Sequence, residues 1–132
     1  MTDPSLLALL LDDIRSAHSL YSTVTRVEID EYQLGILTEG GVHITSYVGW
    51  ELVSSTGKAL RIDADFRKRS IDSYAVCRVI GRRIASVDFD PGGNLVLQLD
   101  PDEKLLVLKT MDFENFMIGL PGKPGYSGVF IF

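Results

Sequence analysis

The side chains that most often perform covalent chemistry are scarce in this chain. It has one cysteine, Cys77, and two histidines, His18 and His43. A nucleophilic thiol needs a neighbouring base, which either histidine could supply if the fold brought it close to Cys77. However, Cys77 stands in an apolar run beside Val76 and Val79, and a lone cysteine in such a run is usually a small core residue. The sequence therefore favours a structural cysteine, and we expect no catalytic residues.

Acidic side chains spaced two residues apart are the nearest approach to a metal-binding pattern. In a strand such pairs share one face, so each pair could offer two oxygens to a hard cation. Alternating acidic residues are also what the solvated face of a half-buried strand looks like. A zinc site would need several Cys or His residues at short spacing, and the sequence lacks them. We therefore expect no metal and no cofactor. The acidic pairs are Glu28 and Asp30, Asp63 and Asp65, Asp88 and Asp90, and Asp100 and Asp102.

The charge balance and the distribution of apolar residues exclude several classes of partner. The chain carries 13 basic and 18 acidic residues, a net charge of −5, which disfavours nucleic-acid binding because that needs clustered Lys and Arg. The longest early apolar run, residues 6–11, ends at Asp12 and is far shorter than the roughly 20 residues of a membrane span. No signal peptide is visible, and a single cysteine fits a reducing compartment. These features predict a cytoplasmic protein whose partner, if it has one, is basic.

One basic cluster departs from the general acidity. Six of the 13 basic residues fall within a short stretch of the chain, where they could hold an acidic ligand or pair internally with neighbouring carboxylates. Because acidic residues are interleaved with them, internal pairing is the favoured interpretation. The cluster consists of Arg67, Lys68, Arg69, Arg78, Arg82 and Arg83, and the candidate internal partners are Asp63, Asp65 and Asp72.

A faint internal repeat organises the chain. The segment 27–30 (Val-Glu-Ile-Asp) reappears sixty positions later as 87–90 (Val-Asp-Phe-Asp). Strand-like apolar pairs follow in both halves, which predicts two meander-like copies of one strand pattern. The expected equivalences are Leu34 and Ile36 with Leu95 and Leu97, Val42 and Ile44 with Leu105 and Val107, Trp50 with Phe116, and Leu60 and Ile62 with Val129 and Ile131.

The remaining segments complete an expected α+β fold. A core-facing helix is predicted over 4–21, because Asp3 and Pro4 resemble a helix start and apolar residues then recur at three- and four-residue steps. After residue 22 the period changes to two. We expect a single domain, 1–132, with this helix packed on an antiparallel sheet. Its parts are copy one over 24–64, a connecting segment over 66–82 that favours a short helix closed by Gly81 rather than a strand, and copy two over 83–132.

The second copy resembles a group of small bacterial proteins of unknown function. The resemblance lies in the run Ile80-Gly81-Arg82-Arg83-Ile84-Ala85-Ser86-Val87, followed by Gly93-Asn94-Leu95-Val96-Leu97 and Lys104-Leu105-Leu106-Val107. Glu114-Asn115-Phe116 stands where that group has a Glu followed closely by Trp, and Trp50-Glu51-Leu52 is its counterpart in the first copy. The resemblance implies no catalytic residues. Immunity proteins, which neutralise a cognate toxin, are similar in size, acidity and strand content.

Two aromatic residues and the last strand leave alternatives open. Trp50 and Phe116 hold equivalent positions, and the sequence favours a core role over a role as partner anchors. The segment 129–132 is apolar on both faces, so it must be buried or pair with another chain at a sheet edge.

These observations predict a non-enzymatic protein-binding module, such as an immunity-type inhibitor that acts by occluding a basic surface. One alternative is a small-ligand or enzyme domain with a cleft between the copies, using His43, Cys77 and the basic cluster; another is a structural homodimer. The candidate partner-binding residues are Glu28, Asp30, Asp88, Asp90, Asp100, Asp102, Glu103, Trp50 and Phe116.

Overall fold

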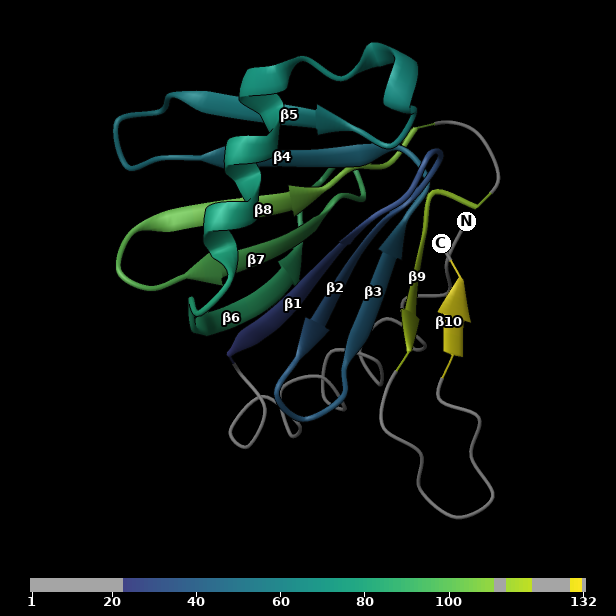
Figure 1. Cartoon of the computed structure of the whole chain (residues 1–132). Coiled ribbons are helices and arrows are strands. Elements are labelled where there is room, and N and C mark those ends of the chain that lie inside the picture. Colours follow the sequence, from purple (N-terminus) through teal and green to yellow (C-terminus); the bar gives the residue numbers. More distant parts are fainter. Residues whose placement is uncertain (1–22, 111–113, 120–128, 132) are drawn as a thin grey trace.

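Two antiparallel sheets form the framework of the protein (Figure 1). The computed structural model describes residues 23–110, 114–119 and 129–131. The first sheet has the order β1 (Val24–Ile29), β2 (Leu34–Thr38), β3 (His43–Ser46), β9 (Phe116–Gly119), β10 (Val129–Ile131). The second sheet has the order β5 (Ala59–Asp63), β4 (Gly49–Val53), β8 (Glu103–Val107), β7 (Leu95–Leu99), β6 (Ile84–Phe89).

The expectation of an α+β fold is wrong, because the described residues are mostly β. Their helical content is confined to two 3₁₀ segments, η1 (Phe66–Lys68) and η2 (Ile71–Val79). The short helix expected in the connecting segment is thus confirmed as η2, and Gly81 follows it with a φ of +84°, a conformation that favours glycine. The helix expected over 4–21 lies outside the described residues.

The internal repeat is confirmed as a structural duplication, but the copies exchange strands. Strands β1 to β3 of the first copy are completed by β9 and β10 of the second, while β6 to β8 are completed by β4 and β5. Both copies carry a register shift at the same place in their first strand, between Val24 and Arg26 and between Ile84 and Ser86. Each sheet therefore depends on both halves of the chain, which supports a single folding unit.

The structure corrects the alignment of two strand pairs. Ile36 pairs with Ile44 in the first copy and Leu97 pairs with Leu105 in the second, so Ile44, not Val42, is equivalent to Leu105. A shift of two residues keeps the same side chains on the same face of a strand, so hydrophobicity alone could not detect it. In the last strand the equivalence moves by one residue: Leu60 pairs with Leu52, and Phe130 pairs with Ile118.

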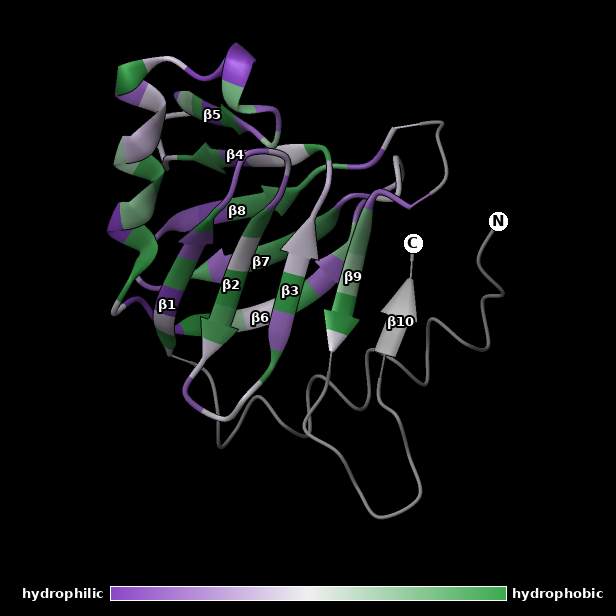
Figure 2. Ribbon diagram, turned by 45° about the vertical axis from the view of Figure 1, so that its right-hand side comes forward, coloured by the Kyte–Doolittle hydropathy of each residue, from purple (hydrophilic) through white to green (hydrophobic). Residues whose placement is uncertain are grey.

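The hydrophobic core lies between the two sheets and under η2. Figure 2 shows apolar and polar residues following one another along β1, and in β7 the buried Leu95, Leu97 and Leu99 alternate with two partly buried residues, which gives that strand one face for the core. Trp50 and Phe116 are fully buried, which confirms their core interpretation. At the corner where the chain enters β4, Gly49 has a φ of +148°, and a Cβ there would lie 2.5 Å from the Ile62 carbonyl oxygen. This close approach requires glycine.

Candidate functional site

The helix η2 presents three distinct rows of side chains. A 3₁₀ helix has three residues per turn, so residues three apart line up along its length. Ser73, Val76 and Val79 form the buried row that fixes η2 to the core. This row explains why a short helix with poor hydrogen-bond geometry holds its place.

The second row is apolar, and its large side chains are exposed to solvent. It consists of Ile71, Tyr74 and Cys77 of η2 with Ile80, which caps the helix; we call it the apolar row. Ile71 is 89% exposed, Tyr74 43% and Ile80 49%, while Cys77 is partly buried. A contiguous row of exposed large apolar side chains is characteristic of an interaction surface.

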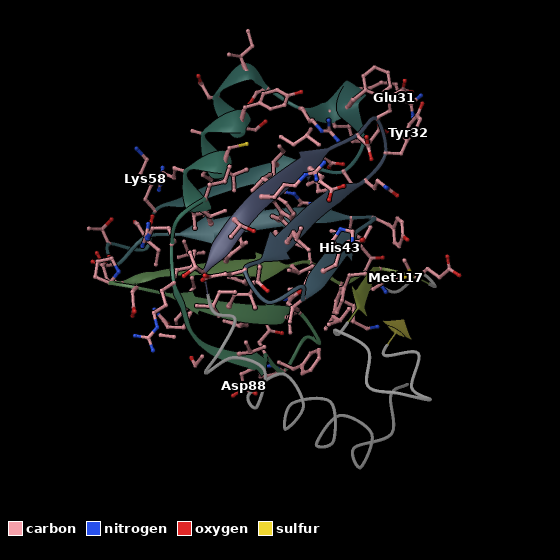
Figure 3. The ribbon with its side chains drawn as sticks, turned by 60° about the horizontal axis from the view of Figure 1, so that its bottom comes forward. Glu31, Tyr32, His43, Lys58, Asp88 and Met117 are labelled. Atoms are coloured by element: carbon pink, nitrogen blue, oxygen red, sulfur yellow. The ribbon has the colours of Figure 1, made fainter. Side chains whose placement is uncertain are left out.

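The third row of η2 lines a groove next to the apolar row. Asp72, Ala75 and Arg78 form one wall, and the groove has a volume of about 810 Å³. In Figure 1, η2 runs across the second sheet from β5 past β4 and β8, and Figure 3 shows Lys58 beside the helix. We call this space the β5–η2 groove; its other lining residues are Leu52, Ser54, Lys58, Ala59, Leu60 and Ile71.

A buried carboxylate ties η2 to the second sheet. Glu103 of β8 is only 8% exposed and accepts a hydrogen bond of 2.7 Å from Arg78 Nη2 and another from Arg82 Nη1. These two guanidinium groups hold the pKa of Glu103 below its ordinary value. Arg82 also donates to the Asp100 carbonyl oxygen at 2.6 Å. The wall of the groove is therefore fixed by ion pairs as well as by apolar packing.

The expected internal pairing of the basic cluster is confirmed in part: within the described residues Arg67 pairs with Asp65, but neither Lys68 nor the expected partner Asp72 forms an ion pair. Arg67 donates to both carboxylate oxygens of Asp65, at 3.0 and 2.9 Å, and this contact lowers the pKa of Asp65 to about 2. Arg69 donates to the Asp63 and Ala64 carbonyl oxygens at 2.7 Å each, and to the carbonyl oxygen of Asp30. Arg69 thus joins the β1–β2 turn to the end of β5. A role for Arg67 or Arg69 in holding an acidic ligand would require these contacts to break.

Three of the residues predicted to bind a partner cannot do so in this structure. Trp50 and Phe116 have no exposed surface, because they occupy equivalent positions in the core between the sheets. Glu103 is buried and bound to two arginines. Their selection as partner-binding residues was wrong for the same physical reason: each is needed inside the protein.

The other predicted acidic residues are exposed or half-buried, but they lie in three separate places. The starts of β1 and β6 meet at an antiparallel bridge between Thr23 and Arg83, so the two strands run away from each other. Figure 3 accordingly places Asp88 far from the turn that holds Glu31 and Tyr32. The geometry gives no single acidic face. One group is Glu28 with Asp30 at the end of β1, the second is Asp88 with Asp90 at the end of β6, and the third is Asp100 with Asp102 between β7 and β8.

The residues considered for catalysis or metal binding are not brought together. His43 lies on β3 with its Nε2 3.5 Å from Glu28 Oε1, whereas Cys77 lies on η2, which packs against β5. His18 lies outside the described residues. Within residues 23–110, 114–119 and 129–131, no group of three or more His, Cys, Asp or Glu side chains could hold a metal ion. In that same part of the chain, no helix has the length and apolar character to cross a membrane.

A second groove does lie between the two copies, but with other residues than expected. It has a volume of about 420 Å³ and is lined by Tyr32 and Tyr47 from the first copy and by Thr110 and Asn115 from the second, among others. Neither His43 nor Cys77 reaches it, and Lys68 is its one lining residue from the basic cluster. Its Arg61 and Asp63 side chains lie 4.0 Å apart and compensate each other's charge.

Sequence reasoning missed the apolar row although a signal was present. Ile71, Tyr74, Cys77 and Ile80 recur at a strict three-residue period, which matches a 3₁₀ helix better than an α-helix of 3.6 residues per turn. Comparison with protein-family models, with curated proteins and with solved structures finds no match to this chain.

Proposed function

We propose that the protein is a non-enzymatic protein-binding module that contacts its partner through the apolar row of η2. The observation that carries this proposal is that a rigidly anchored helix keeps Ile71, Tyr74 and Ile80 in solvent. Exposed apolar area is unfavourable by roughly 25 cal/mol per Å². Covering this row with a partner would recover that free energy.

The composition of the row suits a binding centre. Tyrosine is enriched among residues that dominate interface energies, and Tyr74 lies within the row between Ile71 and Cys77. The adjacent β5–η2 groove offers a concave site for a partner side chain. Because Glu103 and the buried row already fix η2, binding through this face would cost little ordering entropy.

An immunity-type inhibitor is the specific form of this function that we propose. Such a protein acts by covering the working surface of a toxin, which requires a firm apolar contact and no chemistry of its own. The net charge of −5 would speed its encounter with a basic partner. In this account the separated carboxylates steer the encounter, while the apolar row supplies the affinity.

The test compares two tyrosines of similar exposure. Tyr74 is 43% exposed on η2, and Tyr32 is 54% exposed on the β1–β2 turn. Tagged wild-type protein, Tyr74→Ala and Tyr32→Ala are incubated with lysate of the native host, and bound proteins are quantified by mass spectrometry. We expect Tyr74→Ala to retain about tenfold less of a specific partner, the loss of a typical hot-spot tyrosine, and Tyr32→Ala to retain it. Equal retention by the two variants would contradict the proposal.

A further inference from the structure

We propose that the partner contributes an extended peptide segment that adds to β5 as a further strand and places an apolar side chain in the β5–η2 groove. This inference rests on the proposed protein-binding function and specifies how the partner is held. An edge strand beside a helix-walled groove is a recurring arrangement for peptide recognition, in which backbone hydrogen bonds supply affinity and the groove supplies selectivity.

The hydrogen-bond pattern of the β4–β5 hairpin shows which groups of β5 point outward. Ser54 N–H donates to the Lys58 carbonyl oxygen at 2.9 Å, and Ala64 N–H donates to the Val48 carbonyl oxygen at 3.0 Å. Antiparallel pairs alternate between bonded and non-bonded, so the even-numbered residues of β5 direct their backbone groups toward β4. The backbone groups of Ala59 and Arg61 therefore face away from the sheet.

The outward side of β5 is open over part of its length. β5 stands at the end of its sheet, where it pairs with β4 alone within the described part of the chain. Ala59 and Arg61 are both exposed. At the other end of the strand, Arg69 occupies the carbonyl oxygens of Asp63 and Ala64. The added strand would therefore pair with only a short segment of β5, residues 59–61.

The groove determines which side chains the added segment would carry. Alternate residues of a strand project to the same face, so every second side chain of the segment would lie over Leu60 and toward η2. There it would meet the apolar lining provided by Leu52, Ile71 and Ala75. An aliphatic or aromatic side chain fits this surface, because it removes apolar area from water.

The charges at the groove favour an acidic residue in the same segment. Lys58 and Arg78 line the groove, opposed by Asp72 in the first turn of η2. Arg78 is already bound to Glu103, whereas the described residues offer Lys58 no carboxylate within ion-pair distance. Lys58 is therefore the group that a ligand carboxylate would meet. The expected ligand is an extended peptide with an apolar residue and, nearby on the same face, Asp or Glu.

The experiment uses random nine-residue peptides displayed on phage as the probe. Peptides recovered on the wild-type protein are synthesised with a fluorescein label, and their Kd is measured by fluorescence polarisation. Arg61→Pro removes an outward N–H without removing a bond to β4, and edge strands tolerate proline at such positions. Arg61→Ala controls for the side chain, and Ala59→Pro repeats the test at the other outward residue. Trp50 fluorescence verifies that each variant is folded.

We expect recovered peptides to combine an apolar and an acidic residue. Arg61→Pro and Ala59→Pro should weaken their binding about tenfold or more, through a lost hydrogen bond and the clash of the ring with the added strand, while Arg61→Ala changes it little. Lys58→Glu should also weaken binding, and Lys104→Glu, the same charge change at an exposed residue of β8, should not.

Three results would overturn strand addition of a partner peptide at β5. The first is that no peptide is enriched on the folded protein, and the second is that Arg61→Pro and Arg61→Ala have equal Kd values. The third is that light scattering shows a wild-type dimer that Arg61→Pro dissociates, because a second copy of the chain would then be the occupant. A lysate partner lost in Tyr74→Ala but kept in Arg61→Pro would overturn this inference and leave the protein-binding function intact. Conversely, Arg61→Pro could lose peptide binding while Tyr74→Ala still retains the lysate partner. That result would support strand addition at β5 and contradict binding through the apolar row.

Discussion

Replacing Glu103 by alanine should destabilise the protein more than any change at its exposed neighbours. The variant removes the carboxylate that accepts hydrogen bonds from Arg78 and Arg82. The charge of Arg82 would then have lost its carboxylate partner. The Nη2 atom of Arg82 is already buried without a hydrogen-bond partner in the part of the chain that the structure describes. The side chain of Glu103 is 11% exposed, so water cannot easily replace the lost contact.

The magnitude follows from the exposure of the two arginines. A hydrogen bond to a charged group contributes about 1.5–3 kcal/mol, and the Arg82 side chain, 22% exposed, should approach that range. Arg78 is 51% exposed, so its ion pair is screened and contributes below about 1 kcal/mol. The sum is about 3 kcal/mol, which for a domain of this size lowers Tm by roughly 10 °C.

Urea unfolding followed by the fluorescence of Trp50, the only tryptophan, measures this loss. Asp102→Ala is the matched control, because Asp102 is an exposed carboxylate next to Glu103 in sequence. A double-mutant cycle with Arg82→Ala separates the pair from the packing of each side chain. A loss below about 1 kcal/mol for Glu103→Ala, or a coupling energy near zero, would refute the claim that this network fixes η2.

Three further predictions concern pH, backbone geometry and thiol reactivity. The pKa of Glu103 is lowered in the folded protein from 4.5. The stability that Glu103 contributes is therefore complete above pH 4.5 and is lost as the pH falls through the folded pKa. The wild-type protein should lose stability in acid faster than Glu103→Gln, and parallel curves of stability against pH would contradict this. Gly49→Ala should cost about 2 kcal/mol or more, because its Cβ would collide with the Ile62 carbonyl oxygen; a stable variant in urea unfolding would show that the corner can relax. Burial raises the pKa of the Cys77 thiol, so a disulfide reagent should react with it slowly at neutral pH and about tenfold faster in urea. Equal rates in the two conditions would show that the Cys77 thiol is not protected by the fold.

Much of the strand layout could be predicted from the sequence, because alternation of apolar residues marks strands whichever sheet they join. The expected strand residues Leu34 and Ile36 lie in β2, and Leu60 and Ile62 lie in β5. The division into two sheets could not be predicted: Trp50 of β4 pairs with Val107 of the second copy, and strand hydrophobicity does not specify a partner. A period of two also left the alignment of Ile44 with Leu105 ambiguous.

The candidate site was less predictable than the fold. Internal pairing of the basic cluster was expected from its interleaved charges, and it is confirmed for Arg67 with Asp65. Long-range pairs such as Arg78 with Glu103 depend on how η2 lies across the second sheet, which local charge order does not encode. The role of Glu103 was therefore mistaken for that of a surface residue. The apolar row depends on the three-residue period of the 3₁₀ helix η2, which aligns Ile71 with Tyr74 and which an α-helix would not reproduce.

The central claim is that the apolar row of η2 is covered by a partner protein, and site-specific photocrosslinking tests it most directly. A benzophenone amino acid is placed at position 74 in one variant and at position 102, an exposed site on the β7–β8 turn, in another. Both proteins are expressed in the native host and irradiated there. The account predicts a discrete crosslinked partner from position 74 and none from position 102. Crosslinks of equal yield and identity from both positions, or none from position 74 in folded protein, would contradict it.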